Sequence, residues 1–353
     1  MERRVPELPA PFRSPESFRT VFVEGLARLI AEPGLGTFIL ALANASFDPH
    51  LHHLLAPRLA LRFEELAERC REALRRGRPI AEPPDDLLVF LKLAAIGIEG
   101  LPTTAYRRAG PWELQFNVLR SFRPPRATAA RIDAVSAPFA PDGFHFDKPF
   151  LRRELLWEGE LAGRLGGLYY NKFPFVDLHG IWVPEPAARR PQLLTEDDHA
   201  HAWKLVATLG RSLPGAGLGY NAYGAGASVN HLHFQTFVRP EPLPIEDHAW
   251  AHNGGAAVYP AACDVHDDCG RAWRAIEALH AANRPYNLLY RPGRIYLVAR
   301  VFQGAVRHAP WVGGLAWYEI AGGFTCFDVD DLQRLHADDV RVELAQAAPR
   351  RPR

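Results

Sequence analysis

The order of hydrophobic and polar residues divides the chain into a helical first part and a strand-rich second part. An amphipathic stretch runs from Ser14-Pro15 to about Glu32, and a capping residue followed by proline is typical of a helix start. Two further helices are predicted in this part, over 49–77 and 85–99. We therefore expect residues 1–108 to form a helical N-terminal region.

Short β-rich runs bounded by Pro, Gly and Asp replace the helical pattern from Trp112 onward. Strands are predicted over 112–119, 166–171, 286–290, 294–300 and 323–327. A capping-box spacing at Thr195 starts a helix to about Leu213, a glycine-rich turn region covers 215–226, and a further helix is predicted over 268–283. The pattern indicates an α+β fold.

In terms of domains, we expect a second domain over 109–335 and a tail over 336–353 whose end is disordered. Two strand-rich stretches, 112–240 and 284–328, are compatible with two divergent half-units.

Composition and charge favour a small-molecule substrate. The 353 residues carry 41 basic and 40 acidic side chains, a net charge of +1, which provides no broad attraction for nucleic acid or an anionic membrane. Four scattered cysteines do not form a disulfide framework, and the first residues contain no apolar signal core, so a cytoplasmic location is expected. A homodimer is compatible with the sequence, which does not fix the oligomeric state.

The segment Ser228-Val-Asn-His-Leu-His-Phe-Gln235 is the strongest chemical signal. In an extended strand alternate side chains share a face, so His231, His233 and Gln235 are predicted on one face. Leu232, Phe234 and Phe237 are assigned mostly to the other. Burying three polar groups unpaired would cost roughly 1–3 kcal/mol each, so the polar face is expected to line a cleft.

The glycines and small residues of 217–228, Gly224 among them, allow a ligand to approach backbone N–H groups closely, which suits a phosphate. A neutral imidazole at His233 can attack phosphorus without first losing a proton. Ser228 and Gln235 are placed to donate hydrogen bonds to the phosphoryl oxygens. This chemistry requires neither a metal nor another cofactor.

Other histidines and cysteines in the chain suggest different kinds of site. His231 and His233 could instead form a metal pair, because paired strand histidines are common zinc or iron ligands. His50 and His52, like His199 and His201, fall in predicted helices and are interpreted as packing or surface residues. The spacing of Cys263 and Cys269 does not match a structural zinc site, and no dinucleotide-binding or phosphate-loop motif is present.

The stretch from Gly219 to Gln235, GYNAYGAGASVNHLHFQ, resembles the histidine-triad and galactose-1-phosphate uridylyltransferase superfamily, and within it the GDP-hexose phosphorylases. Further segments resemble that family in the same order, at 115–120, 138–148, 170–174, 179–184, 285–289 and 317–322. The resemblance implies an antiparallel sheet with flanking helices. The His-Pro-His-Pro-His sequence and zinc-ligand cysteines of uridylyltransferases are absent.

The resemblance also implies roles for individual residues. His233 occupies the position of the nucleophile that forms a covalent nucleotidyl-histidine, His231 orients it, and Gln235 stands where transferases have glutamine and hydrolases have a third histidine. The implied substrate- and nucleotide-binding residues are Asn117, Arg120, Asn171, Lys172, Asn221, Gly224, Ser228 and Asn230.

The implied activity is phosphorolysis of a GDP-hexose to hexose 1-phosphate and GDP. A diadenosine tetraphosphate phosphorylase or ATP adenylyltransferase is the alternative within the superfamily. From another class, the chain could be a non-catalytic protein that binds a nucleotide or a metal.

Overall fold

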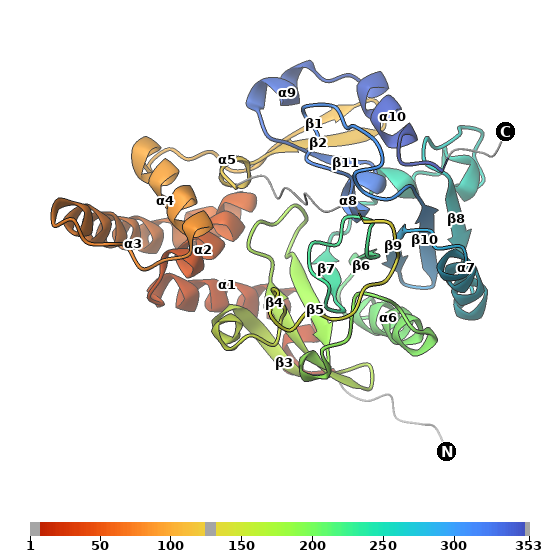
Figure 1. Ribbon diagram of the computed structural model, residues 1–353, viewed down its shortest axis with the longest axis horizontal. Coiled ribbons are helices and arrows are strands. Elements are labelled where there is room, and N and C mark those ends of the chain that lie inside the picture. Colours follow the sequence, from red (N-terminus) through yellow and green to blue (C-terminus); the bar gives the residue numbers. More distant parts are fainter. Residues whose placement is uncertain (1–7, 124–131, 350–353) are drawn as a thin grey trace.

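The computed structural model describes residues 8–123 and 132–349, and it begins with a bundle of helices (Figure 1). These are α1 Pro15–Ala31, α2 Leu35–Phe47, α3 Pro49–Arg75 and α4 Pro84–Ile96. The predicted helices over 14–32, 49–77 and 85–99 are confirmed, with Ser14 capping α1 and Asp48 capping α3. No helix in the described ranges combines the length and apolarity needed to cross a membrane.

Helix α2 was not predicted. Nearly every residue in it is buried, and its sequence LGTFILALANASF is apolar on all sides. A helix without a polar face has no 3.6-residue period, so the periodicity that identified the other helices is missing here.

The second part of the chain forms an eight-stranded sheet in the order β3-β4-β5-β7-β6-β9-β10-β8, and every neighbouring pair is antiparallel. Its strands are β3 Leu155–Leu161, β4 Arg164–Tyr170, β5 Gly180–Pro184, β6 Ala216–Asn221, β7 Phe234–Val238, β8 Cys263–His266, β9 Tyr286–Arg291 and β10 Arg294–Ala299. The expected α+β class with an antiparallel sheet is confirmed.

The expectation of a turn over 215–226 is wrong for its first half, where β6 is a central strand. Positions 217 and 219 of this strand are glycines because aromatic rings lie against their Cα atoms. A Cβ added at Gly217 would lie 2.3 Å from Phe237, and one added at Gly219 would lie 2.2 Å from Trp317.

A smaller sheet covers one face of the large one (Figure 1). It contains β1 Ala105–Ala109, β2 Trp112–Phe116 and β11 Gly323–Cys326, with β11 parallel to β2. The short helices around it are α5 Val118–Ser121, α8 Trp317–Ile320, α9 Val329–Arg334 and α10 Ala337–Ala345. The boundary expected near 108 therefore falls within β1, and α10 occupies part of the segment treated as a tail. The last residues of that tail, 350–353, lie outside the described ranges.

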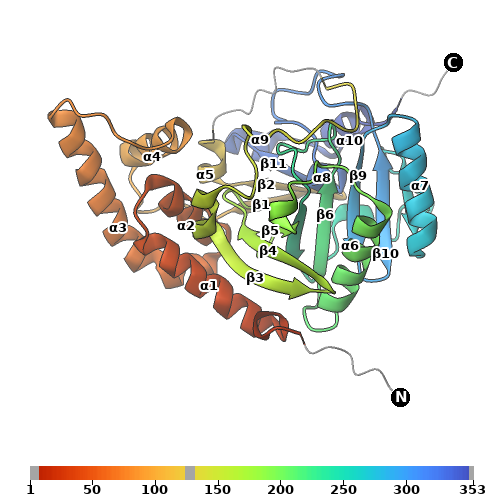
Figure 2. The ribbon, with the colours of Figure 1, turned by 60° about the horizontal axis from the view of Figure 1, so that its bottom comes forward.

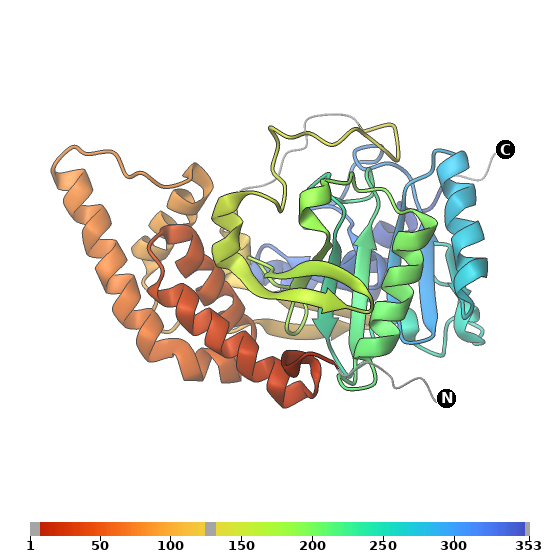
Figure 3. The same cartoon turned by 90° about the horizontal axis from the view of Figure 1, so that it is seen from below.

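The large sheet is buried on both faces. Along β9, Leu288 belongs to the core shared with the N-terminal helices, whereas Leu289 belongs to the core under the small sheet. Helices α6 Glu196–Leu209 and α7 Cys269–Ala281 lie on the same side of the sheet, with α6 against β6 and β9, while α1 runs beside β3 (Figures 2 and 3). The capping box of α6 is confirmed.

The two strand-rich stretches considered as half-units contribute to shared sheets. β9 and β10 extend the large sheet next to β6, and β11 joins β2 in the small one. Short 3-10 helices lie at Ala10–Phe12, Pro149–Glu154, Pro186–Ala188, Pro244–Glu246 and Ala251–Asn253.

Candidate active site

His233 lies immediately before β7 rather than on it, because that strand begins at Phe234. The prediction of a strand running through His231 and His233 is therefore wrong. β6 and β7 pair as far as Gly219 and Gln235. Beyond that point the side chain of Gln192 bonds to the backbone of Asn221 at the end of β6 and of His233 just before β7.

The ring of His233 is fixed by a single hydrogen bond to backbone. Its Nδ1 lies 2.7 Å from the carbonyl oxygen of His231. Because a carbonyl oxygen only accepts hydrogen bonds, Nδ1 must carry the proton, and in the neutral ring the lone pair is then on Nε2. Burial lowers the pKa of His233 to about 4, so the ring is neutral at pH 7. An unprotonated Nε2 is the atom needed for nucleophilic attack.

His231 acts on His233 through its backbone carbonyl. Its own ring accepts a hydrogen bond at Nδ1 from the backbone N–H of Phe146, at 3.0 Å, and packs against Phe139. Burial, and then the neighbouring His233 and His145, lower the pKa of His231 to about 4. The ring of His231 therefore holds the segment that contains Phe146 against the site.

Gln235 follows on β7, and its side-chain oxygen has two neighbours. The indole N–H of Trp317 donates to Oε1 at 2.9 Å, and Nε2 of His179 lies 3.1 Å away. Since His179 accepts the N–H of Phe175 at Nδ1, its proton is on Nε2 and is donated to Gln235. This arrangement fixes Oε1 as the acceptor and leaves the amide nitrogen of Gln235 as a donor.

His179 is a site residue that reasoning from the sequence did not single out, although it lies in one of the matching segments. Burial and the charge of Arg120 lower its pKa to about 3, so the ring is neutral. Asn171, a predicted binding residue, has its Nδ2 3.3 Å from Nε2 of His179 and accepts the N–H of Phe173 at Oδ1. Since the proton on Nε2 is donated to Gln235, the nitrogens of Asn171 and His179 are in contact without a hydrogen bond, and Asn171 and Gln235 lie beside the same ring.

Asn221 and Asn230 lie at the site but support its backbone. The Oδ1 of Asn221 accepts the N–H of Trp317 and an amide proton of Asn287, both at 2.7 Å. Asn230 accepts the N–H of Gln192 at 3.0 Å and donates to the carbonyl oxygens of 137 and 138. Their side chains anchor the loops on either side of His233.

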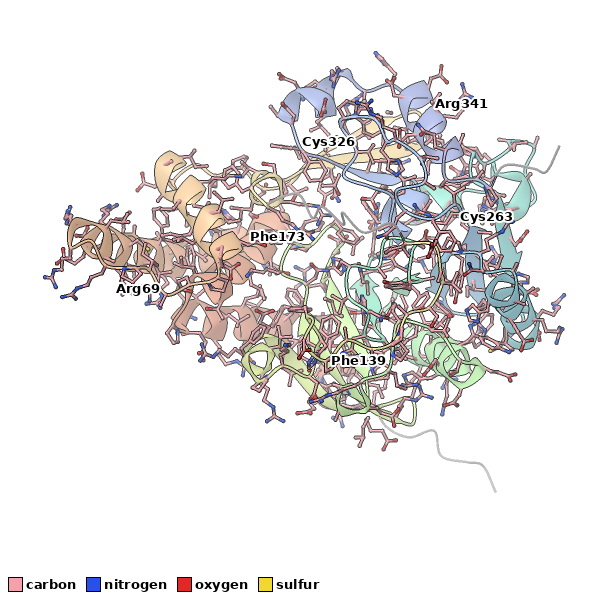
Figure 4. The ribbon with its side chains drawn as sticks, viewed as in Figure 1. Arg69, Phe139, Phe173, Cys263, Cys326 and Arg341 are labelled. Atoms are coloured by element: carbon pink, nitrogen blue, oxygen red, sulfur yellow. The ribbon has the colours of Figure 1, made fainter. Side chains whose placement is uncertain are left out.

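Two further predicted binding residues, Arg120 and Ser228, differ in their surroundings. Arg120 donates a hydrogen bond to the carbonyl oxygen of Phe173, and the guanidinium of Arg120 lies 4.8 Å from the ring centre of Phe175. Phe173 lies between the N-terminal helices and the sheet (Figure 4). Ser228 is exposed on the loop before His231.

Three predicted binding residues have partners away from His233. Lys172 forms an ion pair of 2.5 Å with Asp86 of α4. Asn117 caps α5 and donates to the hydroxyls of Ser46 and Thr104, and Gly224 has a φ of +81° in a turn against Phe302.

The assignment of Phe237 to the face opposite Gln235 is wrong. Residues two apart on a strand share a face, and the ring of Phe237 stacks on Trp317 at 5.2 Å between centroids, beside Gln235. Gln192 and Trp317 were also missed as site residues, because their contacts join segments far apart in sequence. Within the described ranges, no three His, Cys, Asp or Glu side chains are grouped so that they could hold a metal ion.

Part of the chain is similar in sequence to known proteins. Residues 112–237 match the family described as "GDPGP1-like, N-terminal domain". GDP-D-glucose phosphorylase 1 of Danio rerio is 34% identical over 134 residues, which is 37% of either chain. The Homo sapiens protein of the same name is 34% identical over 142 residues, 37% of this chain and 35% of that protein. The match thus spans little more than a third of the length of these relatives.

Among solved structures, yeast Ap4A phosphorylase Apa2 in complex with AMP superposes with a TM-score of 0.46 at 17% identity, over 69% of this chain and 87% of that one. In its complex with Ap4A the TM-score is also 0.46, over 73% and 94%. Residues 112–237 are therefore similar to a GDPGP1-like N-terminal domain, and this part of the chain is distantly related to GDP-D-glucose phosphorylase 1.

Proposed function

We propose that this protein is a nucleotidyltransferase that cleaves a GDP-hexose with inorganic phosphate through a nucleotidyl group carried on His233. The observation that carries the proposal is the ring of His233: its Nδ1–H donates to the carbonyl of His231, which leaves Nε2 unprotonated. Two residues further along the chain, the amide nitrogen of Gln235 is available as a donor because Trp317 holds its oxygen. The family relationship supports the choice of substrate class.

The reaction consists of two displacements at the α-phosphorus. Nε2 of His233 forms a bond to this phosphorus while the bond to the bridging oxygen breaks, and hexose 1-phosphate leaves with the electron pair. An oxygen of inorganic phosphate then attacks the same phosphorus, the P–N bond breaks, and GDP is released with His233 restored. The leaving group is a phosphate of low pKa, so neither a strong general acid nor a metal is required.

Gln235 directs the intermediate toward phosphate. Its amide nitrogen donates to a nonbridging oxygen of the nucleotidyl group, where negative charge accumulates. A neutral amide neither supplies nor removes a proton at pH 7, so activation of water is disfavoured. The bonds of Oε1 to Trp317 and His179 fix which way the amide faces.

Other contacts are assigned according to which side chains can reach a ligand. Ser228 and the loop amides face the phosphates, and Asn171 and Arg120 lie on the side of His179. Lys172 binds a substrate phosphate only after its ion pair with Asp86 opens. Asn117, Asn221, Gly224 and Asn230 act indirectly, by shaping the backbone around the substrate.

The test is formation of the covalent intermediate. Protein incubated with GDP-glucose labelled with phosphorus-32 at the α-position should retain the label after denaturation, and His233→Ala should retain none. His201→Ala is the matched control, because His201 is also buried and its pKa is also lowered to about 4, yet its ring accepts a hydrogen bond from Trp182. An undiminished adduct in His233→Ala would exclude His233 as the nucleophile.

A panel of nucleoside diphosphate sugars and dinucleoside polyphosphates, each with phosphate, measures the substrate class. Preferred cleavage of a GDP-hexose supports the proposal. Preferred cleavage of diadenosine tetraphosphate would replace the proposed activity with that of a diadenosine tetraphosphate phosphorylase. If no compound is cleaved, the proposal that this protein is an enzyme is refuted.

A further inference from the structure

Gln192 is a buried side chain whose three hydrogen bonds all go to backbone at the site. It is only 1% exposed. Its Oε1 accepts the N–H of His233 at 2.9 Å, and its Nε2 donates to the carbonyl oxygens of His233 at 3.2 Å and Asn221 at 2.9 Å. Both backbone polar groups of His233 are therefore held by one side chain.

These bonds occur where two central strands stop pairing. The last paired residues of β6 and β7 are Gly219 and Gln235, so Asn221 and His233 stand two positions further along the same register. In a continuous ladder the backbones of such residues would bond to each other or to the next strands. Here the amide of Gln192 stands between them and provides the missing donor and acceptor.

The backbone of Gln192 is itself fixed. Its N–H donates to Asn230 at 3.0 Å, and its carbonyl oxygen accepts the hydroxyl of Tyr220 at 3.2 Å. Just before it, the carbonyl of Arg190 accepts the N–H of Leu232 at 2.8 Å. The segment around Gln192 is thus bonded to Tyr220, Asn230 and Leu232, and it cannot shift without moving the backbone next to His233.

We propose that Gln192 is a positioning residue for His233: by holding the peptide groups on either side of that residue, it keeps the His231 carbonyl in reach of His233 Nδ1 and so maintains the tautomer with a free Nε2. The nitrogen that carries the proton is set by the hydrogen bond at the other nitrogen. If the backbone at His233 relaxes, the carbonyl of His231 moves away and the ring populates the tautomer with the proton on Nε2, which cannot attack.

The proposal rests on the proposed function only for the chemical role of His233, so its main test does not use activity. In Gln192→Met, nitrogen-15 chemical shifts of the His233 ring at pH 7 should show loss of the single Nδ1–H tautomer and a mixture of both. The control is Gln115→Met, another glutamine that is 1% exposed and donates two bonds, to Phe175 and Thr325. It should lose comparable stability and leave the His233 ring shifts unchanged.

Gln192→Glu provides a second variant of the same shape, in case Gln192→Met does not fold. A carboxylate would face two carbonyl oxygens, whereas a protonated carboxyl can accept from His233 N–H and donate to one of them. Its effect on the His233 tautomer should therefore diminish as the pH is lowered from 8 to 6.

With GDP-glucose, the rate of adduct formation in Gln192→Met should fall about 100-fold, the size of loss expected when a reacting atom is misplaced. An unchanged His233 tautomer in both Gln192 variants would overturn the positioning role. If the tautomer shifts as expected while the wild-type protein forms no adduct, the positioning role stands and the proposed function fails.

Discussion

At the scale of single residues, the site depends on which atom of each side chain is already engaged. His233 has its proton held at Nδ1 by a carbonyl, and Gln235 has its oxygen held by Trp317 and His179. In both cases a bond on one side determines what the other side can do. In the proposed reaction, the nucleophile and the donor are therefore arranged before a substrate binds, which reduces the reorganisation needed in the transition state.

Replacing Gln235 with glutamate tests the donor role. The shape is kept, but the amide donor becomes an oxygen that repels the nonbridging oxygens of the nucleotidyl phosphate. We expect the rate of nucleotidyl transfer to fall about 10²–10³-fold, the range found when one oxyanion donor is lost. Single-turnover labelling measures the rate, and a rate close to that of the wild type would show that Gln235 does not contact the reacting phosphate.

The lowered pKa of His233 makes a prediction for pH dependence. Protonation of Nε2 abolishes the nucleophile, and because burial lowers the pKa to about 4, this protonation occurs well below the ordinary value of 6.5. The rate of adduct formation, measured in brief incubations at a subsaturating substrate concentration, should therefore show no decline with a midpoint near pH 6.5. A midpoint there would mean that the ring is solvated in the active state.

At the scale of elements, two residues predicted to bind nucleotide connect the helical region to the sheets. Asn117 follows β2, caps α5 and bonds to Ser46 near the end of α2, and Lys172 after β4 pairs with Asp86 of α4. Each lies beside the site in sequence but points toward the N-terminal helices. The helical region therefore supports the segments on which the site is built.

Asn117→Ala should destabilise the protein without altering its nucleotide preference. The change removes the cap of α5 and two buried donor bonds, and a loss of about 2 kcal/mol in the free energy of unfolding is expected. Denaturant titration measures this loss. Asn117→Ser keeps a capping oxygen and should lose less, and a changed base preference with unaltered stability would return Asn117 to the binding site.

At the scale of the whole molecule, several histidines are buried in neutral form. Burial is the first cause that lowers their pKa values, to about 3 for His179 and about 4 for His201, His231 and His233. Above about pH 6.5 both folded and unfolded chains carry these rings neutral, so the rings add no pH dependence. Between about pH 6.5 and 4 the unfolded chain binds protons that the folded chain does not. The free energy of unfolding therefore decreases as the pH is lowered through this range.

Acid sensitivity should therefore appear below pH 6.5. Each of these histidines contributes up to ~1.4 kcal/mol of lost stability per pH unit in that range. Glu154 offsets part of the loss, since burial raises its pKa to about 7 and the folded chain takes up that proton. Denaturation midpoints at pH 7, 6 and 5 should fall in order, and His201→Gln should reduce the slope. Midpoints that do not change would contradict the buried neutral rings.

The sequence by itself determined the elements with a clear period or cap, and it located the histidine segment on which the proposed chemistry rests. Ser14 and Thr195 marked helix starts, and the order of residues from Gly219 to Gln235 indicated nucleotidyl transfer. These signals are local, because a cap or a motif involves residues close together in the chain. Helix α2 and strand β6 were not predicted, because they are buried on all sides and their sequences show no alternation of polar and apolar residues.

Only the tertiary structure decided how the site is held. Gln192, Trp317 and His179 come from three separate segments, and each acts through one hydrogen bond or more to a residue near His233 in space. The same contacts decided that Asn117 and Lys172 face the helices. A side chain's partner depends on the packing of distant segments, and one sequence carries no local record of that packing.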